Sequence, residues 1–110
     1  MGNITLNRNR TLKTVDVNVD GSLQLDQSLS YESAFKNLLK EINPSEYSLV
    51  VQASTMSVAN QEIQMILRKL FVLYKTVKFN SISFHTGDNA ILKMQCNQIA
   101  KEVGLDVNII

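Results

Sequence analysis

The sequence has few of the residues on which catalytic and metal sites depend. Its 110 residues include a single histidine, His85, and a single cysteine, Cys96. This pair supplies no spaced set of ligands for zinc, and no Asp-x-Asp-x-Asp loop is present for calcium. Gly87 is isolated, so the sequence has no glycine-rich loop to hold a phosphate. The sequence therefore predicts neither a metal site nor a cofactor.

Other absences limit where the chain resides and what it binds. No run of about 18 apolar residues is present to span a membrane, and the N-terminus has no apolar core of a secretory signal. One cysteine cannot form an internal disulfide, which suits the reducing cytosol. Eleven basic residues balance ten acidic ones, so the net charge of +1 gives no electrostatic basis for binding nucleic acid. We expect a cytoplasmic protein that binds neither membranes nor nucleic acid.

A nucleophilic active site is not expected either. His85 and Asp88 are close in sequence, but Cys96 lies on the following predicted helix, roughly 12 Å along its axis at 1.5 Å per residue. The three side chains should therefore not converge, as nucleophilic catalysis would require. We interpret His85 as a polar loop residue, Asp88 as a helix cap and Cys96 as a half-buried structural residue. The sequence predicts that the chain is not an enzyme.

Amide side chains, by contrast, are abundant. The chain has 11 asparagines and 7 glutamines, nearly as many as its 21 charged residues. Its length suits one domain over residues 1–110 and excludes two-domain enzymes. Residues 1–10 contain Arg8 and Arg10 without an acid, which indicates either a flexible basic arm or a frayed terminus.

Near the N-terminus, the pattern predicts an antiparallel hairpin. Alternating valines are typical of a half-buried strand over residues 11–19. Asp20-Gly21 favours a tight turn after it. Two further alternating leucines then predict a short second strand over residues 23–25.

A helix and a buried strand are expected next. Apolar residues at helical spacing predict a helix over residues 31–42, capped by Ser30 and ended before Pro44. Residues 47–54 then form an apolar strand. Because residues 49–51 are consecutive apolar residues, we expect this strand to be buried on both faces.

The second half of the chain repeats this alternation of helix and strand. A long helix is predicted over residues 61–75, a strand over 79–86 and another helix over 89–103. Gly104 is well placed to end that last helix in a left-handed conformation, and residues 107–110 predict a final strand. The fold class is therefore α/β, with the order ββαβαβαβ and a mixed, mostly parallel sheet covered by three helices.

With this order of elements, the sequence resembles the STAS domain, the fold of anti-sigma-factor antagonists. The order of elements is similar from about residue 12 to residue 110. Three stretches support the resemblance: residues 20–25, Asp-Gly-Ser-Leu-Gln-Leu, residues 49–54, Leu-Val-Val-Gln-Ala-Ser, and residues 103–105, Val-Gly-Leu. The resemblance implies a non-catalytic module that binds a protein partner such as a kinase-like regulator.

The most diagnostic motif of that family is absent. STAS domains of this kind carry Asp-Ser-Ser-Gly-Leu at the start of the second helix, where a kinase phosphorylates a serine. An ungapped comparison places Asn60, Gln61, Glu62 and Ile63 on its first four positions. The resemblance therefore implies a module without this phospho-switch. Glu62 is interpreted either as a mimic of phosphoserine or as an acidic residue that suits the first turn of a helix.

The candidate partner-binding residues lie on the loop after the central strand and on the following helix. Ser54, Thr55 and Ser57 form a hydroxyl-rich segment that is either a phospho-acceptor and contact loop or a solvated connection. The helix adds a polar, mostly uncharged face: Asn60, Gln61, Glu62, Gln64 and Arg68. Amides can bind a partner without the cost of burying charge. The methionines Met56, Met65 and Met94 are expected to fill the core.

Two functions remain open. The first is a non-catalytic protein-interaction and regulatory module of STAS type, which docks through this loop and helix. The alternative is a small structural or assembly subunit, such as a phage or particle component, that self-associates through sheet edges or the N-terminal arm. A large ring or polymer would fit this alternative, whereas a monomer or a homodimer would fit the first function.

Overall fold

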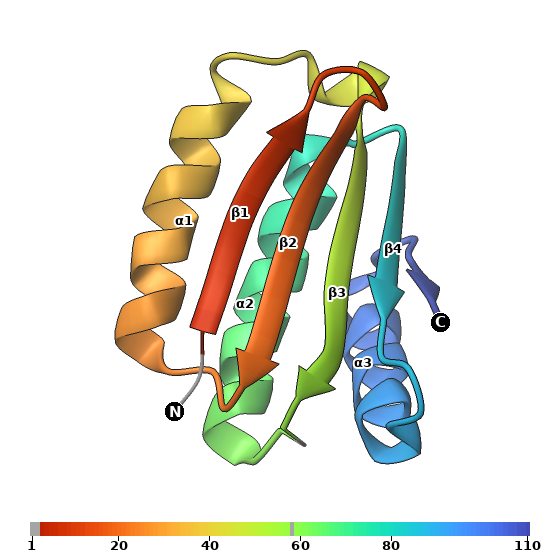
Figure 1. Ribbon diagram of the computed structural model, residues 1–110. Helices are drawn as coiled ribbons and strands as arrows, with labels where there is room; N and C mark the ends of the chain where they lie inside the picture. The colour runs from red at the N-terminus through yellow and green to blue at the C-terminus, as the bar shows by residue number, and fades with distance from the viewer. Residues whose placement is uncertain (1–2, 58) are drawn as a thin grey trace.

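The computed structural model describes residues 3–57 and 59–110, which form a five-stranded sheet and three α-helices (Figure 1). The elements follow one another in this order: β1 (Asn3–Asn9), β2 (Thr14–Gly21), α1 (Leu25–Leu39), the 3-10 helix η1 (Pro44–Glu46), β3 (Ser48–Met56), α2 (Gln61–Val77), β4 (Ser81–His85), α3 (Ala90–Val103) and β5 (Asn108–Ile109). The predicted α/β class and the order ββαβαβαβ are confirmed.

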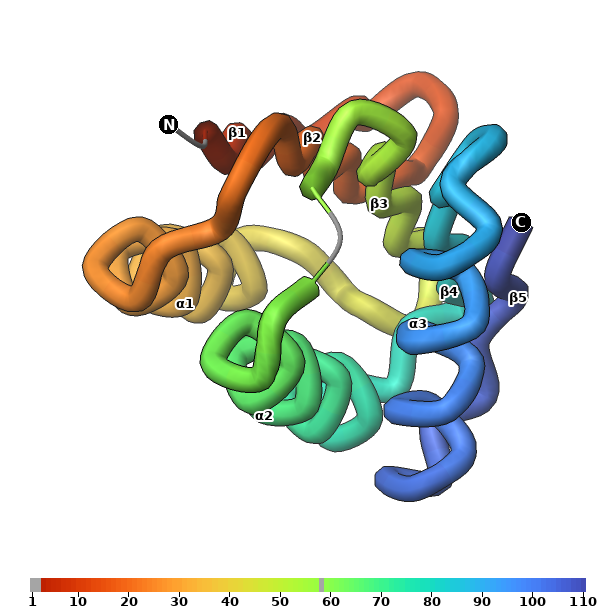
Figure 2. Tube along the Cα trace, turned by 90° about the horizontal axis from the view of Figure 1, so that it is seen from below, coloured from red at the N-terminus to blue at the C-terminus, as the bar shows by residue number. Residues whose placement is uncertain are grey.

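The sheet keeps its strands in chain order, β1-β2-β3-β4-β5. β1 pairs with β2 in the antiparallel sense, and the other neighbouring strands are parallel. Since each right-handed crossover moves one strand further in the same direction, successive helices fall on the same side. Figure 2 shows the three helices along one side of the curved sheet. The mostly parallel sheet is confirmed, and its helical cover is confined to one face.

β3 shows this one-sided burial clearly. Leu49 and Val51 are buried, whereas Gln52 and Ser54 are exposed on the other face. The prediction that this strand is buried on both faces is wrong. Val50, the middle residue of its apolar run, lies on the open face and is only half-buried.

The antiparallel hairpin lies earlier in the chain than predicted. β1 and β2 are joined by a turn at residues 10–13, where Lys13 has a φ of 57°. Asp20-Gly21 ends β2 instead of turning a hairpin, and the chain continues through the buried Leu23 into α1. The predicted turn and second strand are therefore wrong. An Asp-Gly pair favours any left-handed turn, and here Gly21, with a φ of 66°, ends the strand.

β1 replaces most of the expected flexible arm. Residues 3–9 pair with residues 14–20 in continuous register, and residues 1–2 lie outside the described part of the chain. Ile4 and Leu6 are half-buried against the core, while Thr5 between them is exposed. The prediction of an arm is wrong for residues 3–9, because their period of two lets them extend the apolar face of β2.

α1 begins at Leu25, before the predicted cap Ser30, which lies exposed within the helix. The buried face consists of Ser28, Tyr31 and Phe35. Tyr31 also meets Tyr74 of α2, with 2.7 Å between the two hydroxyl oxygens. Burial raises the pKa of both tyrosines, so at neutral pH this is a hydrogen bond between neutral groups in the core.

The methionines divide between core and surface. Met56 is buried, as predicted, but Met65 and Met94 are each 63% exposed. The prediction is wrong for these two because the apolar faces of α2 and α3 are complete without them. Within the described residues, no helix is long and apolar enough to span a membrane.

Candidate functional site

The carboxyl ends of β2, β3 and β4 and the amino ends of all three helices lie at one end of the molecule, the lower end in Figure 1. Open parallel sheets bind their ligands and partners at this end. The connection from β3 to α2 crosses it. Ser57, the first residue of this connection, donates its backbone N–H to the carbonyl oxygen of Gly21 at 2.7 Å, which ties the connection to the end of β2.

Two glutamines hold the next part of this connection. The side-chain oxygen of Gln95, from α3, accepts a hydrogen bond from the backbone N–H of Ala59 at 3.1 Å, and its amide nitrogen donates to the carbonyl of Ala59 at 2.8 Å. Gln64, from α2, donates to the same carbonyl at 3.1 Å. Ala59 is only 3% exposed. Its buried peptide groups are therefore satisfied by side chains from two helices, which fixes the entry to α2.

Two asparagines cap the helices at this end. The side chain of Asn60 accepts a hydrogen bond from the N–H of Ile63 at 2.9 Å, and that of Asn89 accepts one from Leu92 at 3.0 Å. Asn89 also donates to the carbonyl of Met56 at 3.4 Å. Both loops are thus connected to each other as well as to the helices that follow them.

Ser54 and Thr55 belong to β3, so the predicted hydroxyl-rich loop is in part a strand. The Thr55 hydroxyl donates to the carboxylate of Asp20 on the neighbouring strand. Ser54 is packed against the next loop, because a Cβ built on Gly87 would lie 2.9 Å from the Cβ of Ser54. Ser57 follows the strand and is exposed.

The predicted polar face of α2 divides into outward and inward residues. Gln61 and Glu62 are exposed in the first turn. Gln64 is half-buried and bonded to Ala59, and Arg68 forms an ion pair with Glu102 of α3 at 2.7 Å. Only the outward residues are therefore available to a partner without breaking contacts within the fold.

Sequence reasoning missed the exposed apolar residues of α2 and α3. Ile91 is 55% exposed. It lies one helical turn before Gln95, whose side chain bonds Ala59 just before α2. Met65 and Met94 are exposed on the same pair of helices. We refer to the exposed residues Gln61, Met65, Ile91, Met94 and Gln98 as the α2–α3 face. The helical period of α2 could have predicted the exposure of Met65, because it puts Met65 on the side of the helix opposite the buried Ile63 and Leu70.

His85, Asp88 and Cys96 are not brought together as a nucleophilic set. His85 is in register with the exposed Gln52 on the open face of the sheet, where its Nε2 lies 3.3 Å from the Ser83 hydroxyl. Cys96 is buried on the helical side, and burial raises the pKa of its thiol to about 12. Among residues 3–57 and 59–110, no group of three or more His, Cys, Asp or Glu could hold a metal.

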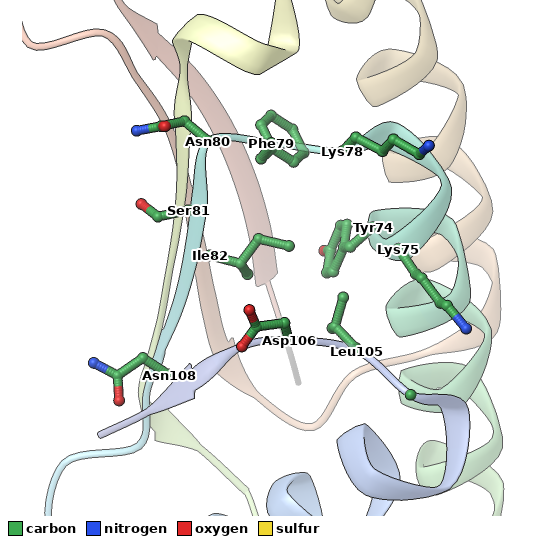
Figure 3. A pocket seen from close by; sticks show the side chains of 11 residues that line it. Tyr74, Lys75, Lys78, Phe79, Asn80, Ser81, Ile82, Leu105, Asp106 and Asn108 are labelled. Atoms are coloured by element: carbon green, nitrogen blue, oxygen red, sulfur yellow. The ribbon is translucent and has the colours of Figure 1, made fainter.

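A separate hollow lies at the opposite end of the parallel strands, between the end of α2 and the start of β4 (Figure 3). Its lining residues include Lys75 of α2, Lys78 directly after α2 and Asp106 before β5. The Lys75 ammonium donates to the carbonyl oxygen of Val103 at 3.1 Å, so it is engaged at the end of α3. The hollow includes none of the predicted partner-binding residues.

Solved structures provide a comparison for the whole chain. An uncharacterized protein of the DUF3478 family with a SpoIIAA-like fold, from Shewanella loihica, matches with a TM-score of 0.70 and 10% identity, over 99% of this chain and 85% of that one. An antisigma-factor antagonist STAS domain from Rhodobacter sphaeroides matches with a TM-score of 0.35 and 13% identity, over 100% and 86% of the two chains. No family model and no curated protein matches the sequence.

The first of these similarities shows the fold. Nearly the whole chain follows a SpoIIAA-like domain, so the STAS-like fold implied by the resemblance is confirmed.

Proposed function

We propose that this chain is a non-catalytic protein-interaction module of STAS type that docks a partner protein through the β3–α2 connection and the amino-terminal half of α2. The observation that carries the proposal is the α2–α3 face, which combines exposed apolar and amide side chains beside a loop held in place by Gln95 and Gln64. Methionine-rich surfaces adapt to a partner's shape, and a backbone segment that is already held by side chains, as Ala59 is, loses little entropy on binding.

The proposed contact residues are Ser54, Thr55, Ser57, Asn60, Gln61, Glu62, Gln64 and Arg68, with Met65 added from the structure. Gln61, Glu62 and Met65 would touch the partner directly, since their side chains are exposed. Asn60, Gln64 and Arg68 would act by holding the loop and helix in position, because each is already bonded within the fold.

Regulation by phosphorylation at the start of α2 is not part of this proposal. Glu62 occupies the position that the resembled family gives to its phosphorylated serine, and it lies exposed in the first turn of α2. A carboxylate there interacts favourably with the helix amino terminus. The module would therefore dock constitutively, with a kinase-like regulator as the expected type of partner.

The test is quantitative affinity capture from the source cell with tagged variants. Met65→Glu puts a charge at an exposed apolar position of the α2–α3 face and should reduce the captured partner at least tenfold. Val72→Glu is the matched control, because Val72 is also exposed on α2 but lies two turns further along. Circular dichroism should be unchanged in both variants. Equal capture by Met65→Glu and the unsubstituted chain would contradict this face.

A further inference from the structure

The geometry points to a second binding surface, beyond the proposed function: the free edge of β1, together with the overhanging α1, forms a groove for an extended peptide segment of another protein. The segment would add to the sheet as a sixth strand. It would carry apolar side chains at alternate positions and a lysine or arginine at the end that lies near Asp26.

The outer edge of β1 is free to pair with another strand. β1 pairs with β2 along its whole length, from the pair Asn3 and Asp20 to the pair Asn9 and Thr14. No other strand within the described residues pairs with its second edge. In an antiparallel pair, alternate residues direct their N–H and C=O groups away from the partner strand. β1 has no proline, lysine or bulge, which are among the devices that block strand addition. Its one charged side chain, Arg8, is half-buried and lies 3.5 Å from a carboxylate oxygen of Glu41.

α1 forms the floor of a groove beside this edge. α1 packs against β1 and α2, and both views show it extending outward beyond the edge of β1 (Figures 1 and 2). A groove of about 410 Å³ lies between this helix and the edge strand. Its lining residues are Asn3, Ile4, Leu6, Asp26, Gln27, Ser30, Tyr31 and Ala34. An added strand about 4.8 Å from β1 would thus have a helix beneath it, as β1 itself does.

The lining residues indicate the chemistry of the segment. Ile4 and Leu6 are half-buried on the side of the sheet that faces α1, and the exposed floor residues Ser30 and Ala34 are small. Apolar side chains at every second position of an added strand would enter this space and cover the two β1 residues. Among residues 3–57 and 59–110, Asp26 is the only charged residue that lines the groove, so it selects a cationic residue at that end of the segment.

A second copy of the whole domain fits this edge poorly. Two copies paired antiparallel through β1 would place their two edge strands about 4.8 Å apart, with both α1 helices beneath the junction on the same side. Packed helices need 8–10 Å between their axes. The overhang of α1 therefore disfavours this pairing of two folded domains but accepts a single extended segment.

The experiment uses the synthetic peptide acetyl-Lys-Val-Thr-Val-Thr-Val-Lys-amide, which has lysine at both ends so that either strand direction can reach Asp26. It is titrated into the ¹⁵N-labelled full chain. We expect chemical-shift changes and slower amide exchange at alternate residues of β1 and along the groove-facing side of α1. A peptide with proline at the central valine should not bind, because it cannot continue the ladder.

Two substitutions test the groove: one fills its floor at Ala34, and the other reverses its charge at Asp26. Ala34→Trp fills the groove and should weaken peptide binding at least tenfold, whereas Ser33→Trp changes the adjacent exposed residue outside the groove and should leave binding unchanged. Asp26→Lys should reverse the preference between the lysine peptide and its glutamate counterpart, by up to about fivefold in each direction.

Several results would overturn the inference. These are no shift at millimolar peptide, shifts that lie outside β1 and α1, equal effects of Ala34→Trp and Ser33→Trp, and a light-scattering dimer that the peptide dissociates. Affinity capture through the α2–α3 face should be unaffected by Ala34→Trp, and peptide binding should be unaffected by Met65→Glu. Each proposal can therefore fail in its own assay without affecting the result for the other.

Discussion

Amide side chains have two different tasks in this chain. Gln95, Gln64, Asn60 and Asn89 bond backbone groups at the ends of α2 and α3. Others, such as Gln61, are exposed at the surface. The high amide content of the sequence therefore reflects structural capping as well as surface polarity, and single substitutions can separate the two.

Gln95→Ala tests the structural task. The substitution leaves the buried N–H of Ala59 without its side-chain partner, while Gln64 still bonds the carbonyl. We expect the free energy of unfolding to fall by about 1–3 kcal/mol, the cost of an unsatisfied buried group. Urea denaturation followed by circular dichroism measures it. Gln98→Ala, at an exposed position of the same helix, is the control. Equal losses in the two variants would contradict the assigned role of Gln95.

The buried thiol of Cys96 makes a prediction about alkaline pH. Its pKa is raised from 9.0 to about 12 by burial. Between these values the unfolded chain releases the thiol proton and the folded chain keeps it, so stability falls as pH rises above about 9. The slope from this group is up to about 1.4 kcal/mol per pH unit. Urea denaturation at several pH values above 9 should show that the free energy of unfolding declines less steeply for Cys96→Ala than for the unsubstituted chain. Parallel declines in the two chains would be evidence against this linkage.

At the scale of elements, the contact between β3 and the loop before α3 requires glycine, which has no side chain, at position 87. Gly87 has a φ of 62°, and a Cβ there would lie 2.9 Å from the Cβ of Ser54. Gly87→Ala should destabilise the fold by more than the roughly 1–2 kcal/mol of a left-handed alanine. In a Ser54→Gly background, the destabilisation caused by the clash with the Ser54 Cβ should disappear. Only the cost of the left-handed conformation of alanine should remain. Denaturation of the four chains of this cycle measures the coupling, and strict additivity would contradict a direct contact.

The elements also show where sequence patterns succeed. α2 and α3 were predicted because their apolar residues follow a 3.6-residue period over several turns, and Gly104 ends α3 with a φ of 73° as expected. The predicted hairpin is wrong because the pattern of β2 is compatible with a partner strand on either side of it in the sequence. Its alternating valines match residues 3–9 as well as residues 23–25, and the Asp-Gly turn signal favoured the wrong partner.

The candidate site was predictable only in outline. The pattern placed a loop and a helix after the central strand, and both are present at the carboxyl end of β3. The orientation of individual side chains was not readable. Gln61 and Gln64 are equivalent in sequence, yet Gln64 turns toward Ala59 because the carbonyl there is buried and needs a donor. Gln95, which is distant in sequence, could be assigned to this loop only through tertiary structure.

At the scale of the whole molecule, the one-sided cover of the sheet predicts the oligomeric state. The open face is polar, with Thr5, Asn18, Gln52 and His85 in one row across four strands. Stable interfaces between identical chains are usually more apolar than this. The edge at β1 is shielded against a second domain by α1. Neither surface therefore favours self-association of the folded chain.

We accordingly expect a monomer in size-exclusion chromatography with light scattering, at concentrations up to about 0.1 mM and independent of salt, since the net charge is only +1. Thr5→Val with Gln52→Val would make the open face more apolar and provides a positive control, because it should promote association. A defined ring or polymer formed by the unsubstituted chain would support the alternative function, a structural or assembly subunit. It would contradict the monomer that the polar face and the α1 overhang predict.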